Sequence, residues 1–555
     1  MRIPTFILCV LVFTGSLCGA QSNDFVASDG ITSELHKANA GRITFMEKTV
    51  PIESYKASDF LSTVTLKEGD DFSMRAFLGN SLTNYLHSLA PALTVEELNK
   101  AGNYRFSFYV DSKLIYEENI NPGAGLPAAK NKSTVLRIPF ISSTQEDSWG
   151  RYLWGRFMAR GGDDALTTGE HSLRVVISTY VNQDTVIVGP QVAEGTVNVI
   201  VLRKGRELSD AEAQPQQIAA NSGWEIDKSP YNKQLIMELK RSIAGLRFKN
   251  ITSIVVIRNG KLLLEEYFNG ATRSTLHDTR SVGKSFASAL TGFAIRDGYI
   301  PDENVMLSRF YTLRDFSNYS PRKDSVTLKS LLTMSSAFNG SDSDSESPGN
   351  EENMYPTDNW VKFTLDLPMD EHKSIGKKWD YFTAGVVVLG DILHRSVPGG
   401  LDEYSRKVLF TPLGIREYKW QYTPQHVANT AGGLGLRSLD LARFGQLYKN
   451  GGVWEGKRLL PAAWVEKTLS PQIDLPQGNG HYGYLFWNTA YTVNGEKHEA
   501  FYCSGNGGNK VFVFKDLPLV VIVTATAYGQ AFAHPQVEKI MEGFVLPAVV
   551  EAIRH

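Results

Sequence analysis

Short segments in which apolar and polar residues alternate dominate the N-terminal third of the chain. Residues 105–110 alternate in this way, a polar turn follows at 111–113, and the pattern resumes at 114–116, which predicts a β-hairpin. Three further segments have the composition of strands, namely 133–141, 171–181 and 196–202. Several short strands separated by turns are typical of a β-sandwich, and we expect a sandwich-like domain over residues 21–204.

The pattern of apolar positions changes after residue 228. Two strand-like runs, 253–258 and 261–268, flank Asn259-Gly260, which is a signal for a tight hairpin turn. Helix-like stretches follow at 328–334 and 439–449, a second hairpin is expected from 510–514 and 519–526, and an apolar-striped helix from 537–553. Strands at both ends with helices between them predict one antiparallel sheet covered by helices over residues 229–555.

Length and local composition predict separate domains and an N-terminal leader. A chain of 555 residues is too long for one ordinary core, and the polar, proline-containing stretch 205–228 is typical of a linker. Arg2 precedes a short apolar run, and small residues at positions 18–20 fit a signal peptide over residues 1–20 that is cleaved after Ala20. Lipid attachment at Cys18 is the alternative, but Leu17 stands where lipoproteins carry a small residue.

The leader predicts export to the periplasm or outside the cell, and composition places the mature chain among globular proteins. Hydrophobic residues make up 42% and charged residues 21%, which excludes a disordered chain. No segment after the leader reaches about 18 consecutive apolar residues, so no membrane span is expected. A net charge of -2 gives no basic surface for nucleic acid. Removal of the leader takes Cys9 and Cys18, which leaves Cys503 alone and excludes a disulfide within the mature chain.

The strongest chemical signal is the pair Ser281 and Lys284, at the start of a helical stretch. A separation of three residues puts both side chains on one helix face. A serine hydroxyl is a poor nucleophile until a base takes its proton, and a neutral lysine one turn away can serve as that base. Ser-x-x-Lys is the nucleophile signature of penicillin-binding proteins and β-lactamases.

The order of further motifs raises the weight of that signature. Segments that match in order are 281–286, 330–336, 379–385, 432–436, 440–447, 482–487 and 501–508. In this order the chain resembles the serine β-lactamase-related hydrolases, in the class C-like branch with esterases, penicillin-binding D-peptidases and nylon-oligomer hydrolases. The resemblance covers about residues 230–553. It implies a β-lactamase/transpeptidase-like domain with an antiparallel sheet, covering helices and a helical subdomain.

The resemblance also implies a reaction and the residues that perform it. Ser281 would form an acyl-enzyme with a small-molecule ester or amide, and Lys284 would take the serine proton. Tyr381 is the second candidate, either as a base or as the group that protonates the leaving group. The oxyanion would be bound by the N–H of Ser281 and a strand N–H near Asn506, and the other candidate substrate-binding residues are Ser504, Gly505 and Thr383. The reaction requires no metal and no other cofactor.

Two departures from the family pattern bear on the substrate. Thr383 stands where the family usually has Asn, and Cys503-Ser504-Gly505 stands where it has Lys-Thr-Gly. The missing lysine argues against recognition of a β-lactam carboxylate, so we expect an esterase or amidase. The alternatives are a β-lactam or D-peptide hydrolase, and a catalytically silent binding protein with the same fold.

Two other segments suggest carbohydrate binding and calcium binding, but we favour a role in the core for the first segment and a place on the surface for the second. The aromatic residues of the segment 104–109 could form a carbohydrate-binding platform, but alternating aromatic residues in strands are usually core. The acidic stretch 341–346 resembles a calcium loop but lacks the glycine at position six and the distant glutamate. We therefore expect residues 341–346 to be a solvated surface loop.

Overall fold

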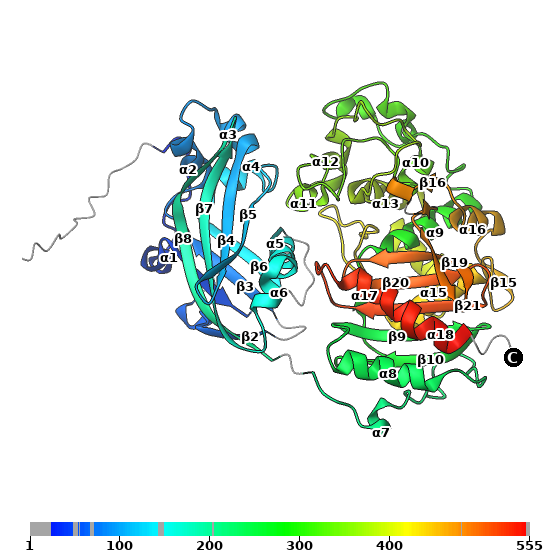
Figure 1. The fold of residues 1–555 in the computed structure, drawn as a ribbon. Coiled ribbons are helices and arrows are strands. Elements are labelled where there is room, and N and C mark those ends of the chain that lie inside the picture. The colour runs from blue at the N-terminus through cyan, green and yellow to red at the C-terminus, as the bar shows by residue number, and fades with distance from the viewer. Residues whose placement is uncertain are drawn as a thin grey trace, which may run out of the picture.

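The computed structural model describes residues 24–47, 54, 56–66, 71–141, 149–202, 205–478 and 480–550 (Figure 1). The expected signal peptide, residues 1–20, lies outside the described residues. Two large sheets organise the chain, one in the N-terminal region and the other in the remainder. Across the described ranges, we find no helix with the length and apolar character needed to cross a bilayer.

The N-terminal region is built on one eight-stranded sheet. Its order is β5-β4-β7-β8-β1-β3-β6, and β2 pairs with β8. The strands are β1 (Arg42–Met46), β2 (Thr63–Leu66), β3 (Phe72–Phe77), β4 (Gly102–Val110), β5 (Lys113–Asn119), β6 (Val135–Ile141), β7 (Gly169–Asn182) and β8 (Val186–Val201). The predicted hairpin is confirmed as β4–β5. The predicted β-sandwich is not confirmed, because these eight strands hydrogen-bond into a single sheet.

Helices take the place of the second sheet that a sandwich would need. They are α1 (Glu34–Asn39), α2 (Leu82–Leu89), α3 (Val95–Ala101), α4 (Pro127–Lys132), α5 (Trp149–Phe157) and α6 (Asp163–Ala165). Helix α5 packs its aromatic residues on the sheet: the rings of Phe157 and Phe108 lie 4.7 Å apart, and those of Trp154 and Phe140 lie 5.3 Å apart. Phe106 and Phe108 are completely buried, so they form core and not an exposed platform.

The second sheet joins the two ends of the remaining chain. Its order is β10-β9-β21-β20-β19-β18-β17-β16. The strands are β9 (Ile251–Arg258), β10 (Lys261–Tyr267), β16 (Ile473–Asp474), β17 (His481–Tyr482), β18 (Trp487–Val493), β19 (Glu496–Gly505), β20 (Asn509–Phe514) and β21 (Leu519–Ala525). Both predicted hairpins are confirmed, as β9–β10 and β20–β21. Every residue of β9, β20 and β21 is buried, which requires helices on both faces of the sheet.

Helices cover this second sheet on both faces. Those of this region are α7 (Asp210–Ala213), α8 (Lys233–Ala244), α9 (Val282–Arg296), α10 (Leu328–Leu332), α11 (Glu351–Met354), α12 (Trp360–Asp366), α13 (Thr383–Ser396), α14 (Gly400–Ser405), α15 (Ser438–Lys449), α16 (Ala462–Thr468), α17 (Ala533–Ile540) and α18 (Leu546–Val550). One core joins α8, α17 and α18 to one face, and a larger core joins α9, α13 and α15 to the other. The helix predicted at 439–449 is confirmed as α15, whereas the one predicted at 328–334 is shorter.

A short three-stranded sheet stands beside the larger one. It has the order β11-β13-β12, with strands β11 (His277–Asp278), β12 (Lys419–Trp420) and β13 (Leu434–Leu436). Two further short strands, β14 (Val453–Trp454) and β15 (Lys457–Arg458), form a separate pair.

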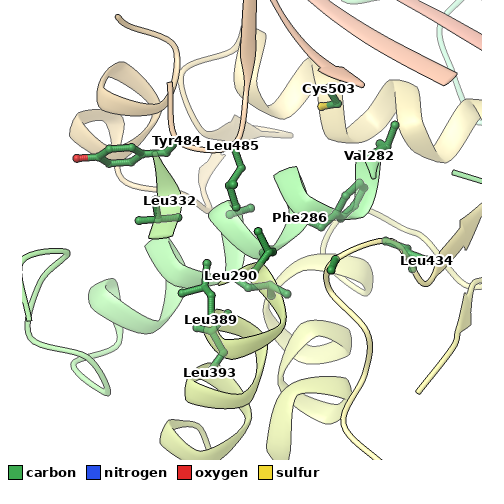
Figure 2. Packing of buried hydrophobic residues seen from close by; sticks show 14 of the residues in the cluster. Val282, Phe286, Leu290, Leu332, Leu389, Leu393, Leu434, Tyr484, Leu485 and Cys503 are labelled. Atoms are coloured by element: carbon green, nitrogen blue, oxygen red, sulfur yellow. The ribbon is translucent and has the colours of Figure 1, made fainter. Parts of the chain in front are cut away.

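Helix α9 lies at the centre of the larger core, where its residues 282–294 are all buried. Figure 2 shows Phe286 and Leu290 of α9 pointing toward neighbours that include Leu389 of α13 and Leu434 of β13. Burial of every residue from 282 to 294 means that protein surrounds this part of the helix on all sides. The first residues of α9 are therefore held rigidly at the edge of this core.

The segment between the two regions has little regular structure. Residues 205–228 contain α7, which is tied to α8 by an ion pair between Asp210 and Arg241. The domain boundaries at residues 204, 228 and 229 stay predictions.

Candidate active site

Ser281 is presented by a sharp turn between β11 and α9. Strand β11 pairs with β13, and the chain then turns through Arg280, whose φ of +53° is in the left-handed region. A non-glycine residue with this backbone is uncommon and costs about 1 kcal/mol or more. The Arg280 guanidinium is held by Asp278 at 2.6 Å. The turn places Ser281 directly before the first turn of α9, at the positive end of the helix dipole.

Lys284 lies one turn along α9 and is only 2% exposed. Its Nζ donates one hydrogen bond to Ser281 Oγ, at 2.8 Å, and another to the carbonyl oxygen of Ala431, at 2.5 Å. The Ala431 carbonyl belongs to the segment before β13 that packs against the start of α9. The amine is thus fixed in hydrogen-bond contact with the serine hydroxyl, as a base for a serine nucleophile must be.

Tyr381 comes from the segment before α13 and completes a cluster with these two residues. It shares a hydrogen bond with Ser281, and its ring centroid lies 5.1 Å from Lys284 Nζ. Burial raises the pKa of the Tyr381 phenol, although the Lys284 amine and the hydrogen bond with Ser281 oppose that shift. A phenol with a raised pKa keeps its proton at neutral pH, so Tyr381 is suited to donate a proton and not to serve as the first base.

Aromatic rings surround the Tyr381 side chain. Trp487, at the start of β18, stacks on it with centroids 5.8 Å apart and an interplanar angle of 28°. Trp379 contacts both rings, at 6.2 Å from Tyr381 and 5.3 Å from Trp487. Trp487 and Trp379 are half-buried, whereas Tyr482 and Tyr484 are 1% exposed and belong to the core. Of these three aromatic residues of the motif segment 482–487, only Trp487 has open surface beside the cluster.

Asp342 is a member of this site that the sequence analysis missed. Its carboxylate accepts hydrogen bonds from the backbone N–H of Thr383, at 2.6 Å, and of Glu351, at 2.9 Å. Its own N–H donates to the carbonyl oxygen of Tyr381 at 2.8 Å. Asp342 therefore fixes the backbone of this segment at two points, the carbonyl of Tyr381 and the N–H of Thr383.

The prediction of a solvated loop over residues 341–346 is wrong for Asp342. Residues 343–346 are exposed as expected, but the Asp342 carboxylate points inward. Burial and the neighbouring Glu351 raise the pKa of Asp342 to about 7, and Lys284 and the bonds from Thr383 oppose the shift. Serines and acidic residues on both sides give the segment a uniformly polar composition, so no pattern in the sequence distinguishes the one carboxylate that turns toward the protein.

The third motif lies against the nucleophile turn through its glycine. Gly505 ends β19, and a Cβ at this position would collide with the carbonyl oxygen of Thr279. Asn506 follows on an exposed turn, and its Oδ1 accepts a hydrogen bond from the N–H of Gly529 at 2.8 Å. Ser504 is half-buried and pairs with Lys510 across β19 and β20. The end of β19 thus lies against the turn that presents Ser281.

The two positions that depart from the family pattern are both inside the protein. Thr383 is the first residue of α13 and is completely buried, so its contribution is the N–H that it donates to Asp342. Cys503 is also completely buried, and burial raises the pKa of its thiol to about 12. A thiol that stays protonated is not a nucleophile.

Comparison with known proteins identifies the larger region. The beta-lactamase family matches residues 246–540, which is more than half of the chain. No curated protein matches the sequence. Among solved structures, a Bacillus anthracis protein assigned as a 6-aminohexanoate-dimer hydrolase has 19% identity and a TM-score of 0.43, over 53% of this chain and 79% of its own.

Two further structures are similar to the same extent. A penicillin binding protein from Bacillus halodurans has 15% identity and a TM-score of 0.43, over 53% of this chain and 97% of its own. A family VIII carboxylesterase has 14% identity and a TM-score of 0.44, over 58% of this chain and 98% of its own. The sequence identities and TM-scores of these structures are low, so the family assignment rests on the match of residues 246–540 to the family.

Proposed function

The chain belongs to the beta-lactamase family of serine hydrolases, and on that premise we propose that it cleaves an ester or an amide through an acyl-enzyme on Ser281. The observation that carries this proposal is the 2.8 Å hydrogen bond between Lys284 Nζ and Ser281 Oγ, with Tyr381 bonded to the same hydroxyl. Nucleophilic catalysis by serine needs a proton acceptor within hydrogen-bond reach, and this arrangement supplies one.

The first half of the reaction transfers the acyl group to the enzyme. Ser281 Oγ attacks the substrate carbonyl while the Lys284 amine takes the hydroxyl proton. The bond to the leaving alcohol or amine then breaks. Tyr381 donates its phenol proton to the leaving group, and Lys284 returns to Tyr381 the proton that it took from Ser281. In the second half, a water molecule attacks the ester on Ser281, its proton goes to the same pair, and the free acid leaves with Ser281 regenerated.

The negative charge that develops on the carbonyl oxygen needs hydrogen-bond donors. We assign this role to the backbone N–H of Ser281, at the start of α9, and to a backbone N–H near Asn506. The positive end of the helix dipole supports the first donor. The contact of Gly505 with the Thr279 backbone supports the second, since a side chain there would hold the strand away from the serine.

The third motif favours a neutral ester or amide over a β-lactam. At the position of the family's cationic lysine the chain has Cys503, which is buried and uncharged. A β-lactam or D-peptide carboxylate would lack that partner. Ser504, which is half-buried on β19, is the side chain of this motif that we assign to the substrate. Export through the N-terminal leader stays part of the proposal.

Labelling with a fluorophosphonate probe tests the proposal. Wild type and Ser274→Ala, which changes an exposed serine in a loop, should react with the probe and hydrolyse p-nitrophenyl acetate. Ser281→Ala should do neither. Retained turnover in Ser281→Ala would refute the mechanism, and an unlabelled, inactive but folded wild type would favour a silent binding protein.

A further inference from the structure

Helix α5 of the N-terminal region also contacts the catalytic region. Figure 1 shows α5 between the N-terminal sheet and the larger region, next to α11. Its residues Leu153, Trp154 and Phe157 are buried in the N-terminal core. Its other side carries Tyr152, Gly155 and Arg156, whose contacts cross to the larger region.

One set of contacts reaches the loop that contains Asp342. Arg156 lies between two carboxylates: its Nη2 is 2.6 Å from Glu118 of the same region, and its Nη1 pairs with Glu352 of α11. The rings of Tyr152 and Tyr355 stack with centroids 5.9 Å apart and an angle of 16°. The Arg156 and Glu352 side chains are 23% and 21% exposed, so this ion pair is largely shielded from solvent.

A second contact reaches the loop that contains Tyr528 and Gly529. A Cβ at Gly155 would lie 3.3 Å from the Cα of Gly529, so the two backbones touch. The N–H of Gly529 donates to Asn506 Oδ1, at the end of β19. The hydroxyl of Tyr528, the preceding residue, donates to the carbonyl oxygen of Asp278 at 3.2 Å, close to the nucleophile turn.

The first contact leads to the candidate proton donor in two steps. Glu352 follows Glu351, whose N–H donates to the Asp342 carboxylate. Asp342 in turn holds the backbone on both sides of the Tyr381 phenol. Helix α5 therefore touches both the loop that positions Tyr381 and the loop that positions Asn506.

Further bonds keep the N-terminal region in this place. Asn121 Nδ2 donates to the carbonyl oxygen of Ser345 at 2.7 Å, and Asp163 pairs with Lys249 at 2.8 Å. The contact thus extends from the acidic loop to the start of β9.

We propose that α5 borders the active site between the loop of Asp342 and the loop of Asn506, so that the N-terminal region restricts the enzyme to compact esters or amides. This inference rests on the proposed function and adds the size of the substrate to it. Arg156 and Gly155 determine specificity, since the first ties α5 to Glu352 beside the Asp342 loop and the second lets α5 touch Gly529. Long acyl chains and polymers are excluded on that side because they would meet α5.

Two variants move α5 without touching the reacting groups. Gly155→Leu puts a branched side chain where a single carbon already meets the Gly529 backbone, so it forces the helix away. Arg156→Ala removes the ion pair with Glu352. The matched control is Arg174→Ala, which breaks a solvent-exposed pair with Glu194 on the N-terminal sheet.

The assay is kcat/KM for p-nitrophenyl esters from acetate to laurate, and for acetate esters of alcohols of increasing size. Wild type and Arg174→Ala should prefer the small members. In Gly155→Leu and Arg156→Ala the preference for small members of one series should fall by about tenfold or more, the scale of a hydrophobic size filter. If one variant does not fold, the other decides.

The outcomes separate this inference from the proposed function. If the folded α5 variants keep the preference for small esters and wild type is active, the inference on α5 is overturned and the proposed function stands. An equal loss of kcat for every ester would also overturn the inference on α5, because that result marks α5 as structural support only. A wild type that hydrolyses no ester and resists the fluorophosphonate probe would overturn both proposals.

Discussion

Replacing Asp342 tests whether one inward-facing carboxylate organises the site. Both of its oxygens accept backbone N–H groups, from Thr383 at 2.6 Å and from Glu351 at 2.9 Å. Asp342→Ala leaves both donors without this acceptor, and an unsatisfied buried donor costs about 1–3 kcal/mol. We expect the free energy of unfolding to fall by about 2–5 kcal/mol, with the lower end applying if water enters the space.

The same substitution should slow the reaction. Asp342 also donates its N–H to the Tyr381 carbonyl, so relaxation of the loop displaces the phenol relative to Ser281. A displacement of about 1 Å can cost about 10²-fold in rate. We expect kcat for p-nitrophenyl acetate to fall between about tenfold and about a hundredfold. Asp342→Asn keeps one acceptor oxygen and should fall between wild type and the alanine variant in both measurements.

Urea unfolding and steady-state kinetics measure the two effects. The matched control is Asp344→Ala, an exposed residue of the same loop whose carboxylate accepts one local N–H, from Glu346 at 3.0 Å. It should change the unfolding free energy by no more than about 0.5 kcal/mol and leave kcat unchanged. The reasoning is refuted if Asp342→Ala behaves like Asp344→Ala in both assays.

The other predictions concern the phenol, the third motif and acid stability. Tyr381→Phe keeps the ring but removes the hydroxyl, so kcat should fall by about 10²-fold. A Tyr381→Phe variant with the same kcat as wild type would exclude Tyr381 as the proton donor. Gly505→Ala drives a carbon into backbone and should abolish activity or folding, whereas Gly543→Ala, which meets no atom within 4 Å, should be tolerated; an active, stable Gly505→Ala would contradict this packing. Burial lowers the pKa of His277 from 6.5 to about 4, so protonation favours the unfolded chain and wild type should lose stability as the pH falls through that range. His277→Gln should lose less over the same range in urea unfolding, and an equal slope would show that His277 does not contribute.

The outer hairpins of the larger sheet and the order of the family motifs could be predicted because their signals are local. The two hairpins of the larger sheet follow from uninterrupted apolar runs beside turn residues, and both form as expected. Five of the N-terminal strands, β4 to β8, were also recognisable, but their arrangement was not. Alternation shows that a strand has a buried face, and it leaves open whether a second sheet or helices such as α5 cover that face.

The sequence by itself determined the relation of Ser281 to Lys284, because three residues of helix bring two side chains together whatever the rest of the chain does. It also determined the family, through motifs that keep their order. Only the tertiary structure decided which distant groups surround that pair. The motif order had already given Tyr381 as a candidate, whereas Asp342 and the α5 contacts come from segments whose approach depends on the packing of the whole core, and packing between distant segments leaves no periodic signal along the chain.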